Sequence, residues 1–325
     1  DERAATARAL DEACTSVGFI QILGHGIPRR IIADLEDAHD AFFGLALEEK
    51  KQFLASGNRG YTPPKSESLS LSLGLENANR MNDFFEAFNA GSEACWYPAL
   101  NLSEQDYAAN TWPTVEGFES KVLAYYHEAA RVARTLTTIF ADALELPSDY
   151  FEYLTDHSVD VLRMVNYALP EGTIRLDDDL KGMGEHTDFG IVTVLWADQV
   201  AGLQVLGTDG VWHDVVPRDG ALLVNLGDLT ARLTNDRWMS TLHRVAPPIV
   251  DGVIERRRSV AFFHDGNSDA TIATLPSHLD ADSGLAYEPV MVKDHILAKL
   301  AGSRQGKANT AAVREASRVL AAQGQ

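Results

Sequence analysis

The chain has 325 residues, of which 45% are hydrophobic, and its formal net charge is −19 at pH 7. This length suits a single domain in which helical additions surround a β-barrel or β-sandwich. So acidic a surface repels phosphate backbones and anionic lipids, and no run of eighteen apolar residues is present, so we expect neither a nucleic-acid partner nor a membrane partner.

The first 157 residues predict a mostly helical N-terminal part. GFIQILG is typical of a short strand, Pro28 is expected to open a helix that ends near Phe43, and another helix is expected from Glu48 to Leu54. The longest helix is predicted from apolar residues that recur three and four positions apart on one face. These residues are Phe118, Val122, Tyr125, Ala129, Val132, Leu136, Ile139 and Ala143.

Two cysteines, Cys14 and Cys95, predict no disulfide framework and favour a reducing cytoplasm. The charged amphipathic start of the chain lacks the apolar stretch of a signal peptide. Because the sequence does not begin with Met, we expect residues upstream of Asp1. The sequence does not indicate an oligomeric state.

After Ser158 the apolar period falls toward two, which is typical of β-strands. The short β-rich segments are VDVLRMVNYA, GIVTVLWA, LQVLG, VWHDVV, ALLVNLG and SVAFFHD. Many short strands at this spacing favour a sandwich or jelly-roll barrel. The tail from Lys293 is expected to return to helix, with one apolar face made of Val313, Ala316, Val319 and Leu320. We therefore predict one α+β domain, with a helical part over 1–157, a jelly-roll core carrying the metal site over 158–292, and a helical tail over 293–325.

Two His-x-Asp triplets are candidate ligand pairs, and their contexts differ. His186 and Asp188 lie just before the strand GIVTVL, where residues i and i+2 project to the same face and can converge on one ion. His278 and Asp280 lie in PSHLDADSG, which is typical of a turn, and only His295, on a predicted helix, follows them. We therefore prefer the first triplet.

A third ligand for this pair is His243, which follows 55 residues after Asp188 at the edge of another apolar segment. Two histidines and one carboxylate leave three positions open on a metal, which suits non-haem Fe(II) enzymes that activate O2. A tetrahedral zinc site would more often recruit Cys or a third His. The alternative is that these are ordinary surface or core histidines.

Arg257 and Ser259 open the strand SVAFF, and their i, i+2 spacing points both side chains to one face. A guanidinium fork and a hydroxyl together match a carboxylate, so this pair would hold a small dicarboxylate or an α-carboxylate beside the metal. For Arg256 and Arg258 we expect a solvated surface position instead.

An ordered set of motifs resembles the isopenicillin N synthase-like family of Fe(II)/2-oxoglutarate-dependent dioxygenases. In order, the motifs are GFIQILGHGIP, LALEEKKQF, NRGYTPP, GEHTDFGIVTVL, GLQVL, GVWHDVVP, ALLVNLGDLTARLTNDRWMSTLHRV and RRRSVAFF. The resemblance extends from about Ala5 to Leu300. It implies a double-stranded β-helix, that is, a jelly-roll core.

The resemblance also implies roles for individual residues. His186, Asp188 and His243 would hold the iron, and Arg257 with Ser259 would clamp the distal carboxylate of 2-oxoglutarate.

A family tyrosine that hydrogen-bonds this cosubstrate is less simply placed, because NYALP departs from the family's usual Asn-Tyr-Tyr-Pro-Pro. Counting from Asn166 would put Ala168 in that position, whereas counting from Arg163 puts Tyr167 there and makes Arg163 its cationic neighbour. We favour the second register. By their position beside the matched motifs, the pocket walls are expected to include Arg59, Tyr61, Phe189 and Phe263.

The implied reaction is the oxidation of an unactivated C–H bond of a small molecule, by hydroxylation, desaturation or cyclisation. It would use O2 and be coupled to decarboxylation of 2-oxoglutarate to succinate. One alternative is an isopenicillin N synthase-type oxidase, in which the Arg-x-Ser pair holds the substrate and 2-oxoglutarate is not used. A second alternative is a non-catalytic jelly-roll binding protein.

Overall fold

The computed structural model describes most of the chain, in several stretches. These are residues 2–73, 83–168, 182–247, 249–250, 253–279, 287–305, 309 and 317.

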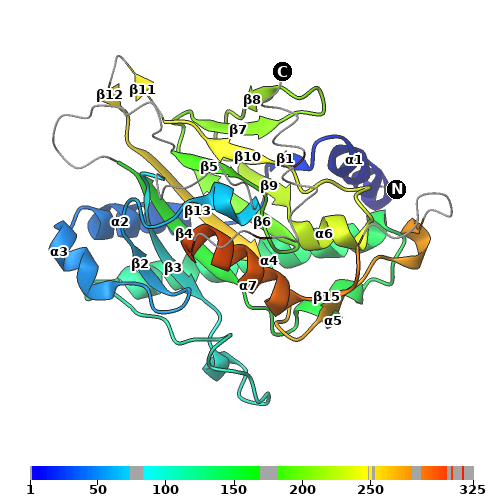
Figure 1. Cartoon of the computed structure of the whole chain (residues 1–325), viewed down its shortest axis with the longest axis horizontal. Helices are drawn as coiled ribbons and strands as arrows, with labels where there is room; N and C mark the ends of the chain where they lie inside the picture. Colours follow the sequence, from blue (N-terminus) through cyan, green and yellow to red (C-terminus); the bar gives the residue numbers. More distant parts are fainter. Residues whose placement is uncertain are drawn as a thin grey trace.

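The core is built on a large antiparallel sheet with the strand order β1-β9-β6-β13-β4-β3-β2 (Figure 1). Its strands are β1 (Phe19–Ile22), β2 (Gly60–Thr62), β3 (Glu86–Gly91), β4 (Val161–Tyr167), β6 (Val192–Ala197), β9 (Leu222–Leu226) and β13 (Arg257–His264). The longest strand, β13, lies in the middle of the sheet and pairs with β4 on one side and β6 on the other. Alternate residues of β13 therefore form the central row of one face of the sheet.

A smaller antiparallel sheet has the order β5-β10-β7-β8. Its strands are β5 (Met183–His186), β7 (Leu203–Leu206), β8 (Trp212–Asp214) and β10 (His243–Val245). Two short pairs complete the strands, β11 (Ile249–Val250) with β12 (Val253–Ile254), and β14 (Thr271–Ile272) with β15 (Val290–Met291). Side chains of both sheets meet in one apolar cluster, which includes Val165, Met183, Leu203 and Val245. The space between the sheets therefore has an apolar lining.

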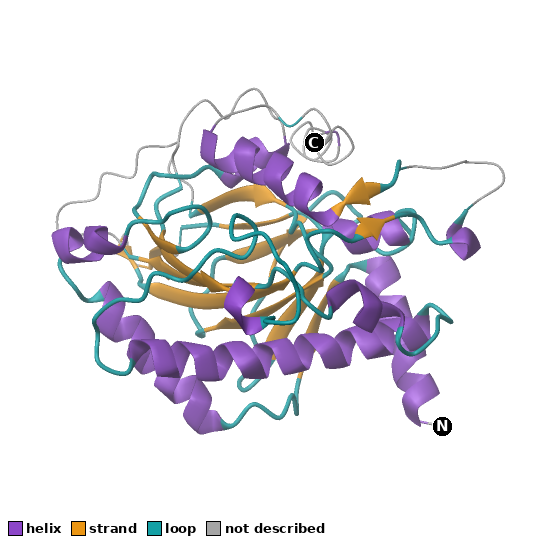
Figure 2. Ribbon diagram, turned by 90° about the horizontal axis from the view of Figure 1, so that it is seen from below, coloured by secondary structure: helices purple, strands orange, loops and turns teal. Residues whose placement is uncertain are grey.

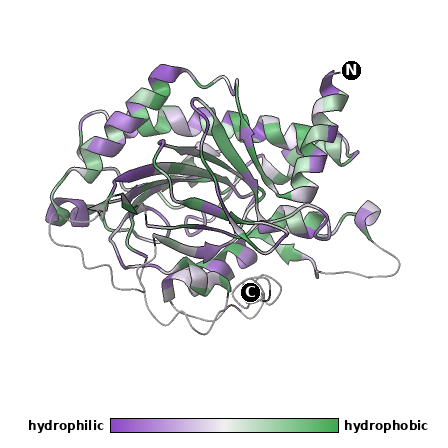
Figure 3. Ribbon diagram, turned by 90° about the horizontal axis from the view of Figure 1, so that it is seen from above, coloured by the Kyte–Doolittle hydropathy of each residue, from purple (hydrophilic) through white to green (hydrophobic). Residues whose placement is uncertain are grey.

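Helices cover the core on two sides. The long helix α4 (Phe118–Ala143) packs against β6 and β13, and α1 (Glu2–Ser16) and α2 (Arg29–Phe43) pack on α4. Figure 2 shows α4 along one side of the sheets and α7 (Val292–Gln305) on the opposite side. Figure 3 shows mostly hydrophobic core strands and outer helices with mixed faces, as the apolar stripe of α4 predicted.

The remaining helical elements are short. They are α3 (Leu47–Lys50), η1 (Lys51–Phe53), η2 (Leu69–Leu73), η3 (Ala94–Trp96), α5 (Tyr150–Thr155), α6 (Asp228–Leu233) and η4 (Pro276–His278). The helix predicted from Glu48 to Leu54 is therefore present as α3 followed by a 3-10 turn. In the part of the chain that the structure describes, no helix combines the length and the apolar character needed to cross a membrane.

The N-terminal part is less purely helical than its sequence suggested. Beside the predicted strand β1, it contributes β2 and β3, which extend the large sheet beyond β4. All six residues of β3, EAFNAG, are buried. A strand covered on both faces need not alternate polar and apolar residues, so this segment shows no period of two.

The tail agrees with the expected return to helix as far as α7. The predicted apolar face of Val313, Ala316, Val319 and Leu320 lies outside the described residues, as does Asp280 of the second triplet. His278 ends the short 3-10 turn η4, in agreement with the turn that its sequence predicted.

Candidate metal and cosubstrate site

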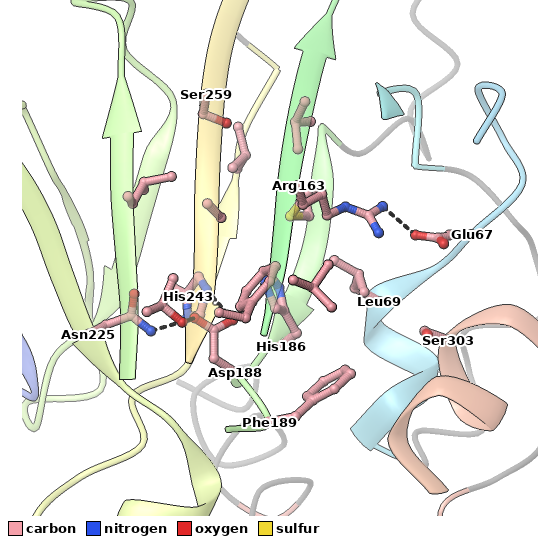
Figure 4. Close-up of a pocket in the computed structure, with 18 of the residues that line it drawn as sticks. Glu67, Leu69, Arg163, His186, Asp188, Phe189, Asn225, His243, Ser259 and Ser303 are labelled. Carbon is pink, nitrogen blue, oxygen red and sulfur yellow. Dashed lines mark hydrogen bonds and ion pairs between the residues drawn. The ribbon is translucent and has the colours of Figure 1, made fainter. Parts of the chain in front are cut away.

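Three of the predicted side chains meet at one end of the space between the sheets (Figure 4). His186 ends β5, Asp188 follows two residues later, and His243 opens β10 directly opposite His186 in the antiparallel register. Oδ1 of Asp188 lies 3.9 Å from Nε2 of His186 and 3.5 Å from Nε2 of His243. One potential ligand atom from each residue lies within 4.8 Å of the others, so the three can contact a single ion.

Backbone carbonyls fix the direction of both imidazole rings. Nδ1 of His186 donates to the carbonyl oxygen of Gly184 at 2.8 Å, and Nδ1 of His243 donates to that of Thr241 at 3.0 Å. Because each Nδ1 donates to a carbonyl oxygen, Nε2 is the atom of each ring that faces Asp188 and can ligate a metal.

The carboxylate is oriented by two neighbours that the sequence analysis did not single out. Oδ2 of Asp188 accepts hydrogen bonds from Oγ1 of Thr193 at 2.5 Å and from Nδ2 of Asn225 at 2.6 Å. Thr193 and Asn225 are register partners on β6 and β9. They occupy one carboxylate oxygen and leave Oδ1 free to face the histidines.

Burial and mutual contact set the charges of this cluster. Burial and the neighbouring His243 lower the pKa of His186 to about 3. Burial opposes ionisation of Asp188, but the adjacent His243 holds the pKa of Asp188 below its usual range. Burial would also lower the pKa of His243, yet the Asp188 carboxylate raises it above its ordinary value. Two imidazole donors and one carboxylate, without sulfur, fit Fe(II) with positions left open.

At the other end of the pocket, Arg257 and Ser259 line one wall from β13. Arg257 is only 1% exposed, and its Nε and Nη1 atoms have no hydrogen-bond partner among the described residues. Its Cζ atom lies 5.1 Å from the ring centroid of Tyr167, which is its register partner on β4. Because an unpaired buried charge is costly, this guanidinium fits an anionic ligand such as a dicarboxylate.

The neighbouring arginines lie outside the pocket, but they are paired rather than simply solvated. Arg256 forms a 2.8 Å ion pair with Asp40, and Arg258 contacts Asp40 at 3.1 Å and Asp198 at 3.5 Å. The pairing with Asp40 was not anticipated, because Asp40 lies on α2, more than two hundred residues before these arginines in the sequence.

The other expected pocket residues divide into two groups. Tyr167, Arg163, Phe189 and Phe263 line the same pocket as the triad. Arg59 and Tyr61, which we expected in the walls, are not among its lining residues. The hydroxyl of Tyr61 donates to Glu86 at 2.6 Å, and Nη2 of Arg59 donates to the carbonyl oxygen of Ser92 at 3.1 Å.

A polar region of the pocket was missed by sequence reasoning. Glu67 bridges Arg163 and Arg304, with N–O distances of 2.6 and 2.7 Å. Asp265 and Asn89 also line the pocket, and Oδ1 of Asn89 has no hydrogen-bond partner in the described part of the chain. Burial and nearby Asp160 raise the pKa of Asp265 well above its usual value. Apart from Arg163, which the sequence analysis named, these residues come from four separate segments, so no local motif indicated them.

Comparisons with known proteins agree with this geometry. The 2OG-Fe(II) oxygenase superfamily matches residues 159–266, and the N-terminal region of the non-haem dioxygenases in morphine synthesis matches residues 1–115. The chain is 35% identical to the 2-oxoglutarate-Fe(II) type oxidoreductase hxnY of Emericella nidulans, over 90% of this chain and 83% of that protein. It is 31% identical to the 2-oxoglutarate-dependent dioxygenase citB of Monascus ruber, over 86% and 85%.

Solved structures give the same result. A full-length Neurospora crassa protein in complex with alpha-KG and thymine superimposes with a TM-score of 0.79 and 25% identity, over 92% of this chain and 91% of that one. A 2OG-Fe(II) oxygenase family protein from Caulobacter crescentus gives 0.78 and 28%, over 94% and 95%. The two facing antiparallel sheets are thus the predicted jelly-roll core. The chain belongs to the 2OG-Fe(II) oxygenase superfamily and is an oxidoreductase that uses Fe(II) and 2-oxoglutarate to oxidise small molecules.

Proposed function

We propose that His186, Asp188 and His243 hold the Fe(II) of this oxygenase and that Arg257, Ser259 and Tyr167 hold its 2-oxoglutarate. The observation that carries the proposal is the buried guanidinium of Arg257, whose Nε and Nη1 have no hydrogen-bond partner in the described part of the chain, in the same pocket as the His-Asp-His cluster. The pocket therefore offers a metal-binding end and an anion-binding end within one cavity, as a chelating dicarboxylate requires.

Bound iron, with 2-oxoglutarate and O2, supplies the oxidant that attacks a C–H bond while 2-oxoglutarate is converted to succinate and CO2. The chain contributes two imidazole donors and one carboxylate, which leave open positions for cosubstrate and O2. Thr193 and Asn225 keep the carboxylate of Asp188 in one orientation by occupying its second oxygen.

The cosubstrate end acts by charge and by a fixed hydrogen-bond donor. Nε and Nη1 of Arg257 would pair with the distal carboxylate of 2-oxoglutarate, and the hydroxyl of Ser259 projects from the same face of β13. Burial raises the pKa of Tyr167 to about 12, so its phenol stays protonated and can donate to the same ligand. The C–H bond attacked by the enzyme would then lie at the end of the pocket away from Arg257.

The substrate end combines apolar and polar walls, which favours a compact molecule with a polar group. Phe189 and Phe263 supply apolar surface, while Asn89, Arg163 and Asp265 supply polar atoms. Thymine, held by the similar Neurospora crassa structure, is one compact polar candidate for testing. We propose a free small molecule as substrate, without a nucleic-acid or membrane partner, because the chain carries a net charge of −19. A reducing cytoplasm suits the free thiols of Cys14 and Cys95.

The test is the release of succinate in step with O2 uptake when Fe(II) and 2-oxoglutarate are supplied, with thymine as the first organic compound added. His243→Ala serves as the metal-binding control. We expect 2-oxoglutarate-dependent succinate in the wild type and none in the variant. O2 uptake by wild-type protein that requires no 2-oxoglutarate would overturn the proposed role of Arg257 and support an oxidase.

A further inference from the structure

Helix α7 forms one wall of the pocket, although it lies far from the metal ligands in the sequence. Ile296, Leu300, Ser303 and Arg304 all line the pocket. Their spacing of four, three and one places them along one side of the helix. Figure 4 shows Ser303 on this helix, across the pocket from Asn225. The position of α7 therefore decides how much space a substrate finds beside the metal.

Lys299 joins this helix to the segment that carries two of the metal ligands. Its Nζ lies 2.9 Å from Oδ2 of Asp228 and donates a 2.8 Å hydrogen bond to Oγ1 of Thr187. Lys299, Asp228 and Thr187 are 1%, 2% and 0% exposed. The same ammonium lies 5.2 Å from the ring centroid of Phe189. Because Thr187 stands between His186 and Asp188, α7 contacts the ligand segment itself.

Asp228 is in turn fixed to that segment. Its backbone N–H donates to the carbonyl oxygen of Asp188 at 2.9 Å, and its Oδ1 accepts from Oγ of Ser240 at 2.7 Å. His295, one helical turn before Lys299, places Nε2 3.3 Å from Oδ2 of Asp228. Two successive turns of α7 thus reach one carboxylate that is bonded to the backbone of a metal ligand.

The other end of α7 rests on the segment around η2. A Cβ atom at Gly302 would lie 2.7 Å from the carbonyl oxygen of Leu71, so the glycine permits this close approach. The carbonyl oxygen of Ser303 accepts from the N–H of Ser68 at 3.0 Å, and Arg304 pairs with Glu67. These contacts hold the helix in place on η2, whereas Lys299 contacts the metal-ligand segment directly.

We propose that Lys299 is a positioning residue that couples the α7 wall of the substrate pocket to the metal site. Through Asp228 and Thr187 it holds α7 against the segment of His186 and Asp188. Binding of Fe(II) and 2-oxoglutarate (loading of the site) then stabilises α7. An ordered α7 in turn raises the affinity of the site for them by the same factor. The inference rests on the proposed function for the identity of the metal and the cosubstrate.

A simple structural ion pair would behave differently from a coupling residue. It would hold α7 in place to the same extent whether or not metal and cosubstrate were bound. The hydrogen bond to Thr187 is the contact that distinguishes these cases, since it ends between two ligands.

Hydrogen exchange of segment 292–305 measures the coupling directly, without and with anaerobic Fe(II) and 2-oxoglutarate. The main variant combines Asp228→Asn with Lys299→Met, so that no buried charge is left without its partner. Thr187→Val removes only the hydroxyl that accepts from Lys299. Lys293→Met, a lysine on the same helix that does not line the pocket, is the matched control.

In the wild type we expect loading to slow exchange of α7 by about fivefold or more, since ligand binding stabilises the region it contacts. The double variant should exchange about tenfold faster without metal and show no slowing on loading. Thr187→Val should exchange like the wild type without metal, but lose most of the slowing. Lys293→Met should match the wild type in both states.

Equal slowing in the wild type and Thr187→Val would overturn the coupling, as would unchanged exchange in the double variant. If the double variant does not fold, Thr187→Val decides the question alone. The charge-transfer absorption of Fe(II) with 2-oxoglutarate is recorded on the same samples. Its absence from the wild type would refute the proposed function, whereas its presence without any slowing of α7 would refute only the role of Lys299.

Discussion

The two walls of the pocket are built in different ways. The metal and cosubstrate wall consists of residues on or directly beside core strands, with alternate residues of β13 in its central row. Opposite the sheet, the substrate wall comes from α7, the segment around η2 and loop ends. A sheet fixes side-chain direction through its register, whereas a packed helix can shift against its support. Changes in the first wall should therefore affect the binding of iron and 2-oxoglutarate strongly, and changes in the second that leave the contacts of Lys299 intact should affect it little.

The largest effect is expected from the three proposed metal ligands. His186→Ala, Asp188→Ala and His243→Ala should each lose measurable Fe(II) binding and all turnover while the protein remains folded. The cause is that a three-ligand site has no spare donor. Metal analysis after dialysis and circular dichroism measure the two properties. His278→Ala is the control and should bind iron normally. Iron loss in that variant would mean that the triplet of His186 and Asp188 is the wrong choice.

Arg257→Ala should be next, and selective for the cosubstrate. Removing one partner of a desolvated charge pair costs about 3–5 kcal/mol, which corresponds to a loss of a few hundredfold or more in 2-oxoglutarate affinity. Iron binding should persist because Arg257 does not contact the triad. Arg258→Ala is the adjacent control, since its side chain pairs with Asp40 and Asp198 outside the pocket. Isothermal titration that found Arg258→Ala the more damaging change would reverse the assigned face of β13.

Changes in the residues that orient Asp188 should have an intermediate effect on iron. Asn225→Ala and Thr193→Val each remove one hydrogen bond to Oδ2 of Asp188, and loss of such an outer contact weakens metal binding by about 10–100-fold. Competition with a fluorescent chelator measures the change. Unaltered affinity in both variants would mean that the ligand set holds its geometry without them.

Acidification should destabilise the protein partly through His39, which lies behind the cosubstrate wall. Its Nε2 donates to the carbonyl oxygen of Val165 and its Nδ1 faces Arg256, so the buried ring is neutral. Burial lowers the pKa of His39 to about 3. The unfolded chain, with an ordinary histidine pKa, therefore binds the proton first as the pH falls.

Neutral His39 makes its full contribution to the free energy of unfolding at pH values above the pKa of the unfolded histidine. This contribution is lost progressively as the pH falls from that pKa to the pKa of His39 in the folded protein. Between pH 7 and pH 5 this loss is about 2 kcal/mol. Urea unfolding of His39→Gln should show a pH dependence smaller by that amount than the wild type. An identical pH dependence in both proteins would contradict a neutral His39.

The smallest effect on iron and cosubstrate is expected from the substrate wall. Leu300→Ala enlarges the pocket at α7 but touches neither the triad nor Arg257, so both affinities should stay within about twofold of the wild type. Competition with a fluorescent chelator and isothermal titration measure the two affinities. A tenfold loss of 2-oxoglutarate affinity would show that the α7 wall acts on the cosubstrate by a route other than Lys299.

The same difference between the walls explains what the sequence could predict. The i, i+2 spacing of His186 with Asp188, and of Arg257 with Ser259, follows from strand geometry, so both pairs could be recognised in the amino-acid sequence. Thr193 and Asn225 could have been found only from the pairing of β6 with β9, which no local pattern specifies. Strand β3 was missed because both of its faces are buried, and its residues show no alternation.

Phe189 and Phe263 of the substrate wall were predicted, but its ion pairs were beyond prediction for another reason. Glu67, Arg163 and Arg304 are joined only by tertiary packing, and their separations in the sequence exceed ninety residues. Arg59 and Tyr61 were expected in the wall because a matched motif contains them. In the structure their polar atoms bond to Ser92 and Glu86 instead. A motif places a segment near a site, but packing decides which side chains face it.

The central claim is that one pocket holds iron at His186, Asp188 and His243 and 2-oxoglutarate at Arg257. Anaerobic titration of 2-oxoglutarate into the Fe(II)-loaded protein, followed by a pulse of O2, tests it most directly. We expect a weak metal-to-ligand charge-transfer band that Arg257→Ala shifts to much higher 2-oxoglutarate concentration, and succinate after the pulse. The claim would be contradicted if no band formed with 2-oxoglutarate, yet iron and another carboxylate compound together consumed O2 without producing succinate.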